Sequence, residues 1–490
     1  MRFYTNIQQY NNVILERYIE DGIHKQREVP YQPTLYVPTV KQSPFKTIKG
    51  EVVEPRGFNS IKEARDFIQA RQKVSNDPVY GMQQFAYAYI QEQYPEREFD
   101  VNQLNILNFD IETRSDEGFP NIQEADMEIL SIALRCNGQS YILGCGEYKP
   151  SGDDKYIKCV SEADLLHKFI DLWKELDPDI ITGWNIEMFD IPYTLNRIKR
   201  RLSTEAVNQL SPWGIVKDRL IPTAQTQAQG DNAEPNAKEI FGITVFDYMN
   251  LYKKFTYSQQ ESYALDYIGS AELGEKKLDY SEYGTLNELY KNDYQKFLDY
   301  NIKDVVLVER LDDKMKLIEQ ACTIAYDAGV NLIDSMTSVR MWDVIIHNFL
   351  MNKQIVVPPK EFGEKENQVE GAYVKDPQVG LHNWVVSFDL NSLYPHLIMQ
   401  YNISPETYVR HIGQRPTADE IIAGLYNNEN IKEFMKKHNV SVCGSGAMYT
   451  KDFQGFLPKL METMYNDRVK WKTQMIEAKK KYEANPTKEL

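Results

Sequence analysis

The feature of this sequence that most constrains its fold is an alternation of strand-like and helix-like segments between residues 105 and 316. The segments "MEILSIALRC" and "PDIITGWN" have the apolar character of buried strands. Between them, "SEADLLHKFIDLWKEL" begins with a capping serine and continues with the apolar periodicity of an amphipathic helix. Strands that alternate with helices predict an α/β domain, with helices packed on a sheet.

The rest of the chain predicts further domains, because 490 residues are enough for about three. We expect a small α/β N-terminal domain over residues 1–104, followed by the α/β domain over 105–316. Residues 317–360 are expected to be mainly helical, residues 361–454 return to strands, and residues 455–490 form the start of a long charged helix.

Three local expectations are more specific. Residues 286–322 predict one long helix, and "WVVSFDL" (384–390) predicts a strand with alternating faces. The polar tract 223–238 predicts a surface loop or a loose hairpin.

Composition excludes several classes of protein. The five cysteines form no C-x-x-C pair, so neither a disulfide framework nor a zinc site is expected. No apolar run approaches the ~18 residues of a membrane span, and the first residues lack the apolar core of a signal peptide. Taken alone, the net charge of −15 argues against a nucleic-acid binder, because phosphate contacts need lysine and arginine. Charge is local, however, and basic clusters occur at residues 197–201 and 468–481.

The strand-like stretch "ILNFDIET" places Asp110 and Glu112 two residues apart, so both side chains point to one face of a strand. Acids make up about one residue in seven, and about ten such pairs are expected by chance. An exposed strand end is therefore the alternative interpretation. The apolar residues before Asp110 favour a buried strand that carries two carboxylates to one site.

Two more acids have a comparable setting. Asp190 precedes Ile191 and Pro192 at a predicted helix N-terminus, where a plain capping aspartate is the alternative. Tyr300 and Asp304 are four residues apart in a predicted helix and share its apolar face. A tyrosine–aspartate hydrogen bond within a core would also explain that second pair.

Four converging carboxylates would repel one another unless cations neutralised them. Oxygen ligands suit Mg²⁺ or Mn²⁺, and two such ions about 3.5–4 Å apart can support hydrolysis of a phosphodiester bond. A set made of Asp110, Glu112, Asp190 and Asp304, with Tyr300 nearby, therefore predicts a metal-dependent nuclease.

The strings "FDIET", "GWNIEMFDIPY" and "YNIKD" resemble, in order and spacing, the three exonuclease motifs of family B DNA polymerases. The resemblance implies a multidomain α/β protein with an RNase H-like 3′→5′ exonuclease domain. It also implies that Asp110, Glu112 and Asp304 hold two metal ions, with Asp110 bridging them. Asp190 would act partly through water, and Tyr300 would orient the attacking water.

A second stretch, "WVVSFDLNSLYPHLI", resembles motif A of the polymerase site in the same family. The resemblance implies that Asp389 is a metal ligand and that Leu390 contributes its carbonyl oxygen. It implies that Tyr394 stacks under the incoming sugar and excludes a ribose. The backbone amides that would cradle the deoxynucleoside triphosphate belong to Ser392, Leu393 and Tyr394. A capping aspartate in a strand-to-helix turn is the alternative for Asp389.

Two weaker matches concern binding of DNA and nucleotide. "EGAYVKDP" resembles the family's connector between exonuclease and polymerase parts, which implies that Gly371 and Ala372 contact the template strand. A strand with a glycine at a bulge is the alternative. Arg468 and Lys472 lie on one face of the predicted last helix, where the family binds triphosphate, although a solvated basic face explains them equally well.

The second carboxylate strand of the polymerase site, Y-G-D-T-D in the family, does not occur between residues 390 and 490. The expected content is therefore a complete exonuclease, a partial palm over residues 361–454 and the start of the fingers. We expect this to be the amino-terminal portion of a longer polymerase, with 317–360 as the second segment of its N-terminal domain. DNA synthesis is expected only together with a C-terminal polymerase chain.

Likeness along the whole chain points to the replicative polymerases of T-even-like phages, a branch of this family. It implies single-stranded and primer-template DNA as partners, a sliding clamp reached only through the missing part, no membrane, and the cytoplasm of an infected bacterium as the setting. A non-catalytic DNA-binding or scaffold subunit of a replisome is the alternative function. The presence of all the exonuclease acids favours the enzyme.

Overall fold

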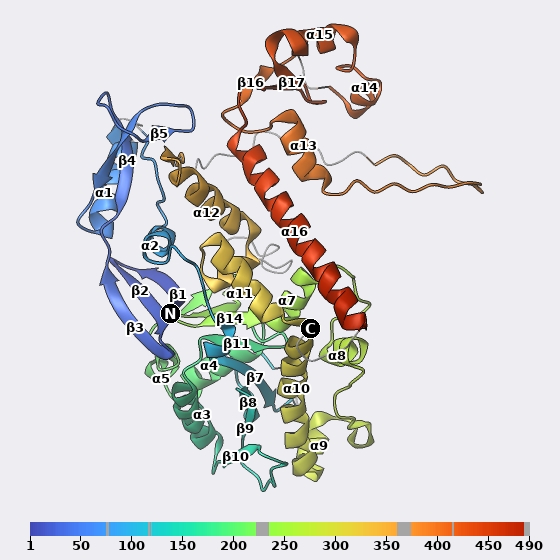
Figure 1. Ribbon diagram of the computed structural model, residues 1–490. Coiled ribbons are helices and arrows are strands. Elements are labelled where there is room, and N and C mark those ends of the chain that lie inside the picture. The colour runs from blue at the N-terminus through green and yellow to red at the C-terminus, as the bar shows by residue number, and fades with distance from the viewer. Residues whose placement is uncertain are drawn as a thin grey trace. The chain divides into compact units, whose positions relative to one another are not determined.

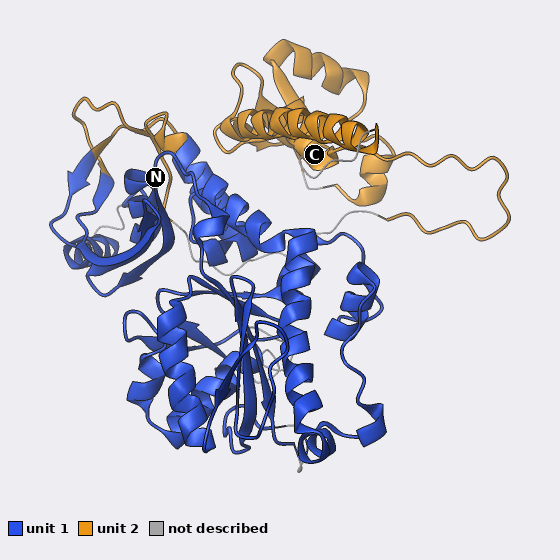
Figure 2. Ribbon diagram, turned by 60° about the horizontal axis from the view of Figure 1, so that its bottom comes forward, with its two compact units in different colours: residues 1–36, 55–349 blue, residues 37–54, 350–490 orange. Residues whose placement is uncertain are grey.

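A computed structural model describes residues 1–74, 78–115, 118, 120–221, 235–359, 374–413 and 416–484. The chain divides into two compact units (Figure 2). The first unit comprises Met1–Tyr36 and Pro55–Phe349, and the second comprises Val37–Glu54 and Leu350–Leu490.

The first unit begins with an antiparallel sheet of three strands, ordered β1-β2-β3. Tight turns at Asn11 and Asp21, both with positive φ, join its strands. Buried side chains on β1 pack against helix α2. The elements of this part are β1 (Arg2–Tyr10), β2 (Val13–Glu20), β3 (Ile23–Pro30), β4 (Thr34–Pro38), β6 (Val53–Gly57), α1 (Ile61–Val74), α2 (Phe85–Gln93) and the 3₁₀ helix η1 (Val101–Gln103).

A mixed sheet of six strands forms the centre of the unit, in the order β10-β9-β8-β7-β11-β14 (Figure 1). Strand β7 pairs antiparallel with β8 on one side and parallel with β11 on the other, so it is central. The strands are β7 (Ile106–Thr113), β8 (Ile129–Cys136), β9 (Gln139–Gly144), β10 (Lys155–Lys158), β11 (Ile180–Gly183) and β14 (Thr244–Asp247).

Helices cover both faces of this sheet. Leu107 and Phe109 of β7 point to the face covered by α3 and α4, where Phe109 stacks on Phe169 with ring centroids 5.7 Å apart. Residues 108, 110 and 112 alternate to the opposite face, which α10 covers. The helices on the sheet and its loops are α3 (Glu162–Leu176), α4 (Asp190–Arg201), α7 (Tyr248–Phe255), α8 (Leu265–Leu273), α9 (Leu286–Asn292) and α10 (Tyr294–Met315).

The expected single helix over 286–322 is wrong, because the structure has three successive helices there. Asp293 separates α9 from α10 and caps α10 by accepting the amide of Lys296. Lys316 adopts a left-handed conformation, with φ 55°, and separates α10 from α11 (Leu317–Ala328). Apolar periodicity continues through both breaks, so it could not reveal them.

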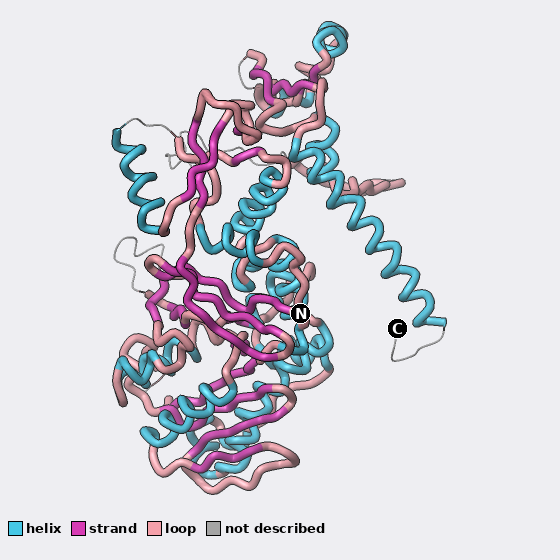
Figure 3. Tube along the Cα trace, turned by 60° about the vertical axis from the view of Figure 1, so that its left-hand side comes forward, coloured by secondary structure: helices cyan, strands magenta, loops and turns pink. Residues whose placement is uncertain are grey.

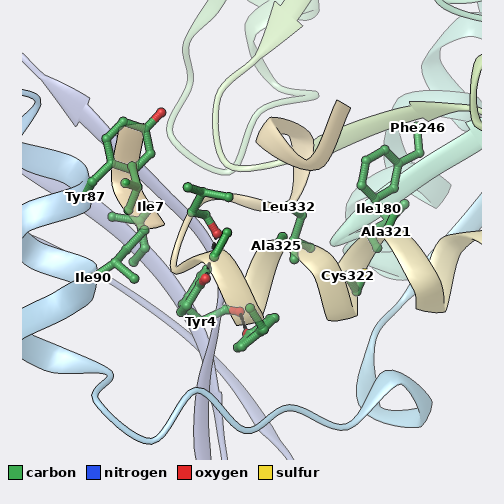
Figure 4. Close-up of a cluster of buried hydrophobic side chains, with 14 of the residues drawn as sticks. Tyr4, Ile7, Tyr87, Ile90, Ile180, Phe246, Ala321, Cys322, Ala325 and Leu332 are labelled. Atoms are coloured by element: carbon green, nitrogen blue, oxygen red, sulfur yellow. Dashed lines mark hydrogen bonds between the residues drawn. The ribbon is translucent and has the colours of Figure 1, made fainter. Parts of the chain in front are cut away.

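Helix α11 and the turn after it pack on the N-terminal sheet (Figure 4). The hydroxyl of Tyr4 donates to the carbonyl of Val330 at 2.6 Å, and the Tyr4 ring stacks on Tyr326. Asn331 accepts the amide of Ile7 at 2.7 Å. The same cluster extends to Ile180 and Phe246 of the central sheet. The three-stranded and six-stranded sheets of the first unit therefore share one hydrophobic cluster. The predicted domain boundaries at 104, 316 and 360 remain predictions.

The remaining elements of the first unit are short. Strands β12 and β13 pair antiparallel and flank residues 222–234, so most of the predicted polar loop at 223–238 lies outside the described residues. These elements are α5 (Thr204–Asn208), β12 (Val216–Arg219), β13 (Ala237–Ile240), and the 3₁₀ helices η3 (Ser281–Tyr283) and η4 (Leu332–Met336). Helix α12 (Ser338–Met351) runs to the division between the units.

The second unit contains a small three-stranded sheet and a long last helix. Val440, Val442 and Met448 form the core of the sheet, against α15. Helix α13 packs on α16, where His396 meets Tyr465 edge to face. Its elements are β5 (Lys46–Thr47), β15 (Ile355–Val356), α13 (Leu393–Tyr401), β16 (Tyr408–His411), α14 (Ala418–Ile422), α15 (Glu429–His438), β17 (Val440–Val442), β18 (Ala447–Thr450) and α16 (Phe456–Ala484).

The expected strand at 384–390 is wrong. Residues 374–392 contain no strand or helix (Figure 3), and the side chains of Val385, Val386 and Phe388 are 70–89% exposed. A strand needs a neighbour to satisfy its backbone hydrogen bonds, and no strand in the described part of the chain pairs with this segment. None of the described helices is both long and apolar enough to cross a bilayer.

Candidate functional site

Three acidic side chains meet where β7 passes under α10. Asp110 and Glu112 lie on the α10 face of β7, as their spacing predicts, and Asp304 projects from α10 toward them. One carboxylate oxygen from each lies within 4.8 Å of the others. Among the residues that the structure describes, no other group of three or more such side chains comes so close.

Asp190 reaches the same place from the other side of β7. It is the first residue of α4 and is 5% exposed. Its Oδ1 accepts the backbone amide of Ile111, the residue between Asp110 and Glu112, at 3.1 Å. Asp190 is therefore more than a cap of its own helix, because it is tied to the strand that carries the other acids.

The loop between β11 and α4 places Asp190 beside β7. Gly183 ends β11, and a Cβ at this position would overlap the carbonyl oxygen of Phe109 on the neighbouring strand. Asp247 then accepts the backbone amides of Asn185 and Glu187, each at 3.2 Å, and fixes the loop between β11 and α4. Sequence reasoning did not identify Asp247, although it ends β14 and caps α7, which are its two local signals.

Lys277 is a second residue that sequence reasoning missed. Its Nζ donates to Oδ2 of Asp304 at 2.5 Å and to the hydroxyl of Tyr300 at 3.1 Å. Its backbone amide donates to Asp266 at the start of α8, which anchors this loop residue. Nothing in the string "GEKKLDY" distinguishes Lys277 from the adjacent Lys276, so only the tertiary structure reveals it.

Burial and mutual repulsion strongly perturb these acids. Burial, and then the charge of Asp304, raises the pKa of Glu112 to about 8. Burial raises the pKa of Asp190 to about 7, although the amide of Ile111 opposes the shift. Burial and the neighbouring carboxylates also raise the pKa of Asp110 well above its usual value. The surroundings therefore do not compensate the negative charge that the cluster would carry if all its acids were ionised.

The donor set fits divalent cations. Oδ1 of Asp304 is buried and has no hydrogen-bond partner, so one lone-pair site points at nothing in the protein. Burial also raises the pKa of Asp304, whereas the ammonium of Lys277 lowers it. One lysine cannot neutralise four acids, and carboxylate oxygens are the ligands that Mg²⁺ and Mn²⁺ prefer.

Tyr300 stands one turn before Asp304 and is 8% exposed. Burial, and then the charge of Asp304, raises the pKa of its hydroxyl well above the usual value, so it stays protonated at neutral pH. The ring of Tyr280 packs edge to face against it, with centroids 5.3 Å apart. The hydroxyl is thus a fixed neutral group at the edge of the acid cluster.

The predicted polymerase residues have a different setting. Asp389 is exposed, as are the side chains of Leu390 and Tyr394. Ser392 has a left-handed backbone, with φ 54°, immediately before Leu393 begins α13. No acidic metal cluster includes Asp389 among the described residues.

The remaining predicted contacts are only partly visible. Arg468 of α16 lies 3.4 Å from the side-chain oxygens of Asn391 and Ser392. Lys472, one turn further along α16, is exposed. Gly371 and Ala372 lie outside the described residues.

Comparison with known families gives two matches along the chain. Residues 55–268 match "DNA polymerase family B, exonuclease domain", and residues 330–487 match "DNA polymerase family B". Asp110 and Asp190 fall in the first match and Asp389 in the second, whereas Tyr300 and Asp304 lie between them.

Individual relatives extend the similarity over nearly the whole chain. The chain is 31% identical to the DNA-directed DNA polymerase of Enterobacteria phage T4 over 97% of its own length, and 30% identical to that of Escherichia phage RB69 over 98%. It is 28% identical to the DNA polymerase delta catalytic subunit of Caenorhabditis elegans over 63% of its length. The chain spans 54% of each phage relative and 29% of the nematode protein.

Proposed function

The chain belongs to DNA polymerase family B, and from that premise we propose that it is a metal-dependent 3′→5′ exonuclease that removes nucleotides from single-stranded DNA and the ends of primers. The observation that carries the proposal is the convergence of Asp110, Glu112 and Asp304 from two elements distant in sequence. Such a cluster has little structural value without cations, because burying like charges is costly.

Asp110, Glu112 and Asp304 would hold Mg²⁺ or Mn²⁺ ions. When bound, the ions would neutralise the carboxylates, hold the scissile phosphate and offset charge on the leaving oxygen. Asp190 supports this arrangement by binding the backbone of β7 between the two acids. Asp190 would contribute further charge partly through a water molecule.

The neighbouring residues supply positioning and charge balance. Tyr300, held protonated, can hydrogen-bond an attacking water and orient it toward the phosphate. Lys277 holds Asp304 in place and leaves its second oxygen free for a cation. Burial alone would lower the pKa of Lys277, but Asp304 and its neighbours raise it, so the ammonium persists.

We propose that DNA synthesis requires residues that this chain does not supply. Asp389, Leu390, Ser392, Leu393 and Tyr394 would provide one half of a polymerase site, with Arg468 and Lys472 near the triphosphate. A two-metal site needs further carboxylates, and the family's Y-G-D-T-D string does not occur between residues 390 and 490. Gly371 and Ala372 would contact template backbone.

The wider setting is also a proposal. The similarity to polymerases of phages T4 and RB69 supports a role in proofreading during phage DNA replication, in the cytoplasm of an infected bacterium. Primer-template DNA and deoxynucleoside triphosphates would bind only in a complete polymerase, and a sliding clamp would bind the part outside this chain.

The test is degradation of 5′-labelled single-stranded DNA with Mg²⁺. We expect progressive shortening from the 3′ end with release of nucleoside monophosphates, and loss of this activity in Asp110→Ala and in EDTA. Absence of shortening, or equal shortening by Asp110→Ala, would refute the nuclease. DNA binding without cleavage would instead support the non-catalytic subunit.

A further inference from the structure

Asn301 lies within the "YNIKD" string and next to the acid cluster, but the family resemblance gives it no role. It lies on α10 between Tyr300 and Asp304 and is 0% exposed. Its amide nitrogen donates to Oδ2 of Asp110 at 2.6 Å. A fully buried amide with a hydrogen bond to a proposed metal ligand is placed to control that ligand's orientation.

Ser131 extends the hydrogen-bonded chain from Asp110 through Asn301. It lies on β8 directly opposite Glu112 of β7, so their side chains share the face that α10 covers. Ser131 is also 0% exposed, and its hydroxyl donates to the amide oxygen of Asn301 at 2.8 Å. The amide oxygen accepts from Ser131 while the amide nitrogen donates to Asp110, so the two contacts together hold the Asn301 side chain in one orientation.

The connection matters because the last torsion of an aspartate side chain is broad. Without a donor on one oxygen, the carboxylate of Asp110 could rotate and present different lone pairs to the cations. Asn301 fixes it without adding charge. Two of the other acids are fixed similarly, since Lys277 binds one oxygen of Asp304 and the amide of Ile111 binds one oxygen of Asp190.

We propose that Ser131 and Asn301 are positioning residues for metal binding, with Ser131 setting the orientation of the Asn301 amide and Asn301 setting the orientation of Asp110. The inference rests on the proposed nuclease site. Ser131 then acts on metal binding only through Asn301, so the effects of changing the two residues are coupled.

The test is a double-mutant cycle read by calorimetric titration with Mn²⁺ and no DNA, so that binding is measured apart from activity. Asn301→Leu should weaken Mn²⁺ binding about 10- to 100-fold, as is typical of residues that orient metal ligands. Ser131→Ala should weaken it about 3- to 10-fold, the effect of one hydrogen bond. The double variant should bind Mn²⁺ no more weakly than Asn301→Leu alone.

Ser140→Ala is the matched control. Ser140 is a buried serine of the same sheet, on β9, and its hydroxyl accepts a hydrogen bond from Arg135 rather than contacting the acids. It should bind Mn²⁺ as the unmodified chain does. Near-ultraviolet circular dichroism will show whether Asn301→Leu is folded. If it is not, the Mn²⁺ affinity of Ser131→Ala compared with that of Ser140→Ala tests the inference.

Unchanged Mn²⁺ affinity in Ser131→Ala would overturn the inference, as would strictly additive losses in the double variant. Either result leaves the proposed function intact if the unmodified chain degrades DNA. Conversely, an unmodified chain that binds Mn²⁺ but degrades no DNA would refute the proposed function, while the cycle still tests the positioning of Asp110.

Discussion

Asp110 and Asp389 both follow a run of apolar residues in the sequence, but their surroundings differ. Strand β7, which carries Asp110, is paired with β8 on one side and β11 on the other and lies under α10. The segment that carries Asp389 pairs with no described strand and exposes its apolar side chains. A functional motif therefore becomes a site only where the chain also provides the elements that hold it.

The largest expected effect separates the two aspartates by nuclease activity. Asp110→Ala should reduce the rate of single-stranded DNA degradation by more than about 100-fold, the upper range for residues that merely orient metal ligands. Asp389→Asn should change that rate by less than about twofold, since Asp389 belongs to no described acid cluster. A large loss in Asp389→Asn, measured by gel analysis of labelled DNA, would remove the distinction.

The difference in burial predicts a difference in stability. Leu307 of α10 is 0% exposed, so Leu307→Ala should lower the free energy of unfolding by about 2–5 kcal/mol. Val386 is 70% exposed, so Val386→Ala should lower the free energy of unfolding by less than about 0.5 kcal/mol. Urea unfolding followed by tryptophan fluorescence measures both. A costly Val386→Ala would show that the segment around Asp389 is buried in solution.

Lys277 tests how the acid cluster is balanced. Lys277→Met should leave Asp304 without its donor and cost about 1–3 kcal/mol of stability in EDTA. The loss should shrink when Mg²⁺ is added, because a cation can then compensate the carboxylates. The exposed neighbour provides the control, and Lys276→Met should cost less than about 0.5 kcal/mol under both conditions. A loss that is independent of Mg²⁺ would mean that Lys277 acts only in packing.

The smallest expected effect is the pH dependence of the free energy of unfolding, which should depend on His24 but not on His382 in the exposed segment before Asp389. Nδ1 of His24 lies 3.3 Å from Asp179, and its Nε2 lies 3.1 Å from the carbonyl of Gln103. The contact with the carboxylate of Asp179 raises the pKa of His24 above its ordinary value of 6.5. A raised histidine pKa contributes stability that is present below about pH 6.5 and is lost as the pH rises through the folded-state value.

The free energy of unfolding should therefore fall by less than about 1 kcal/mol from pH 6 to pH 8 through this pair, which is partly solvated. His24→Gln should remove that component. His382→Gln, in the exposed segment before Asp389, should retain it. An identical pH dependence in His24→Gln and the unmodified chain would contradict the assignment.

The sequence predicted those parts of the site that depend on local periodicity. Strand alternation placed Asp110 and Glu112 on one face, and helical spacing placed Tyr300 and Asp304 on another. The serine cap of α3 was also readable, since Ser161 accepts the amide of Asp164.

Features determined by tertiary contacts could not be read from the sequence. Lys277 carries no distinguishing local pattern, because its side-chain partners are distant along the chain. Asn301 lies within the "YNIKD" string and Asp247 caps α7, but their contacts with Asp110 and with the loop before α4 join residues distant along the chain. Lys316 breaks a helix through its backbone conformation, although lysine is an ordinary helix former. The segment at 384–390 has a strand-like pattern, but a pattern cannot guarantee a neighbouring strand.

The most direct test of the central claim is anomalous diffraction from crystals of this chain soaked in Mn²⁺. We predict strong anomalous peaks among the carboxylates of Asp110, Glu112 and Asp304, with no comparable peak at Asp389. An acid cluster without a peak, or a peak at Asp389 alone, would contradict the assignment of the metal-binding site to the contact between β7 and α10.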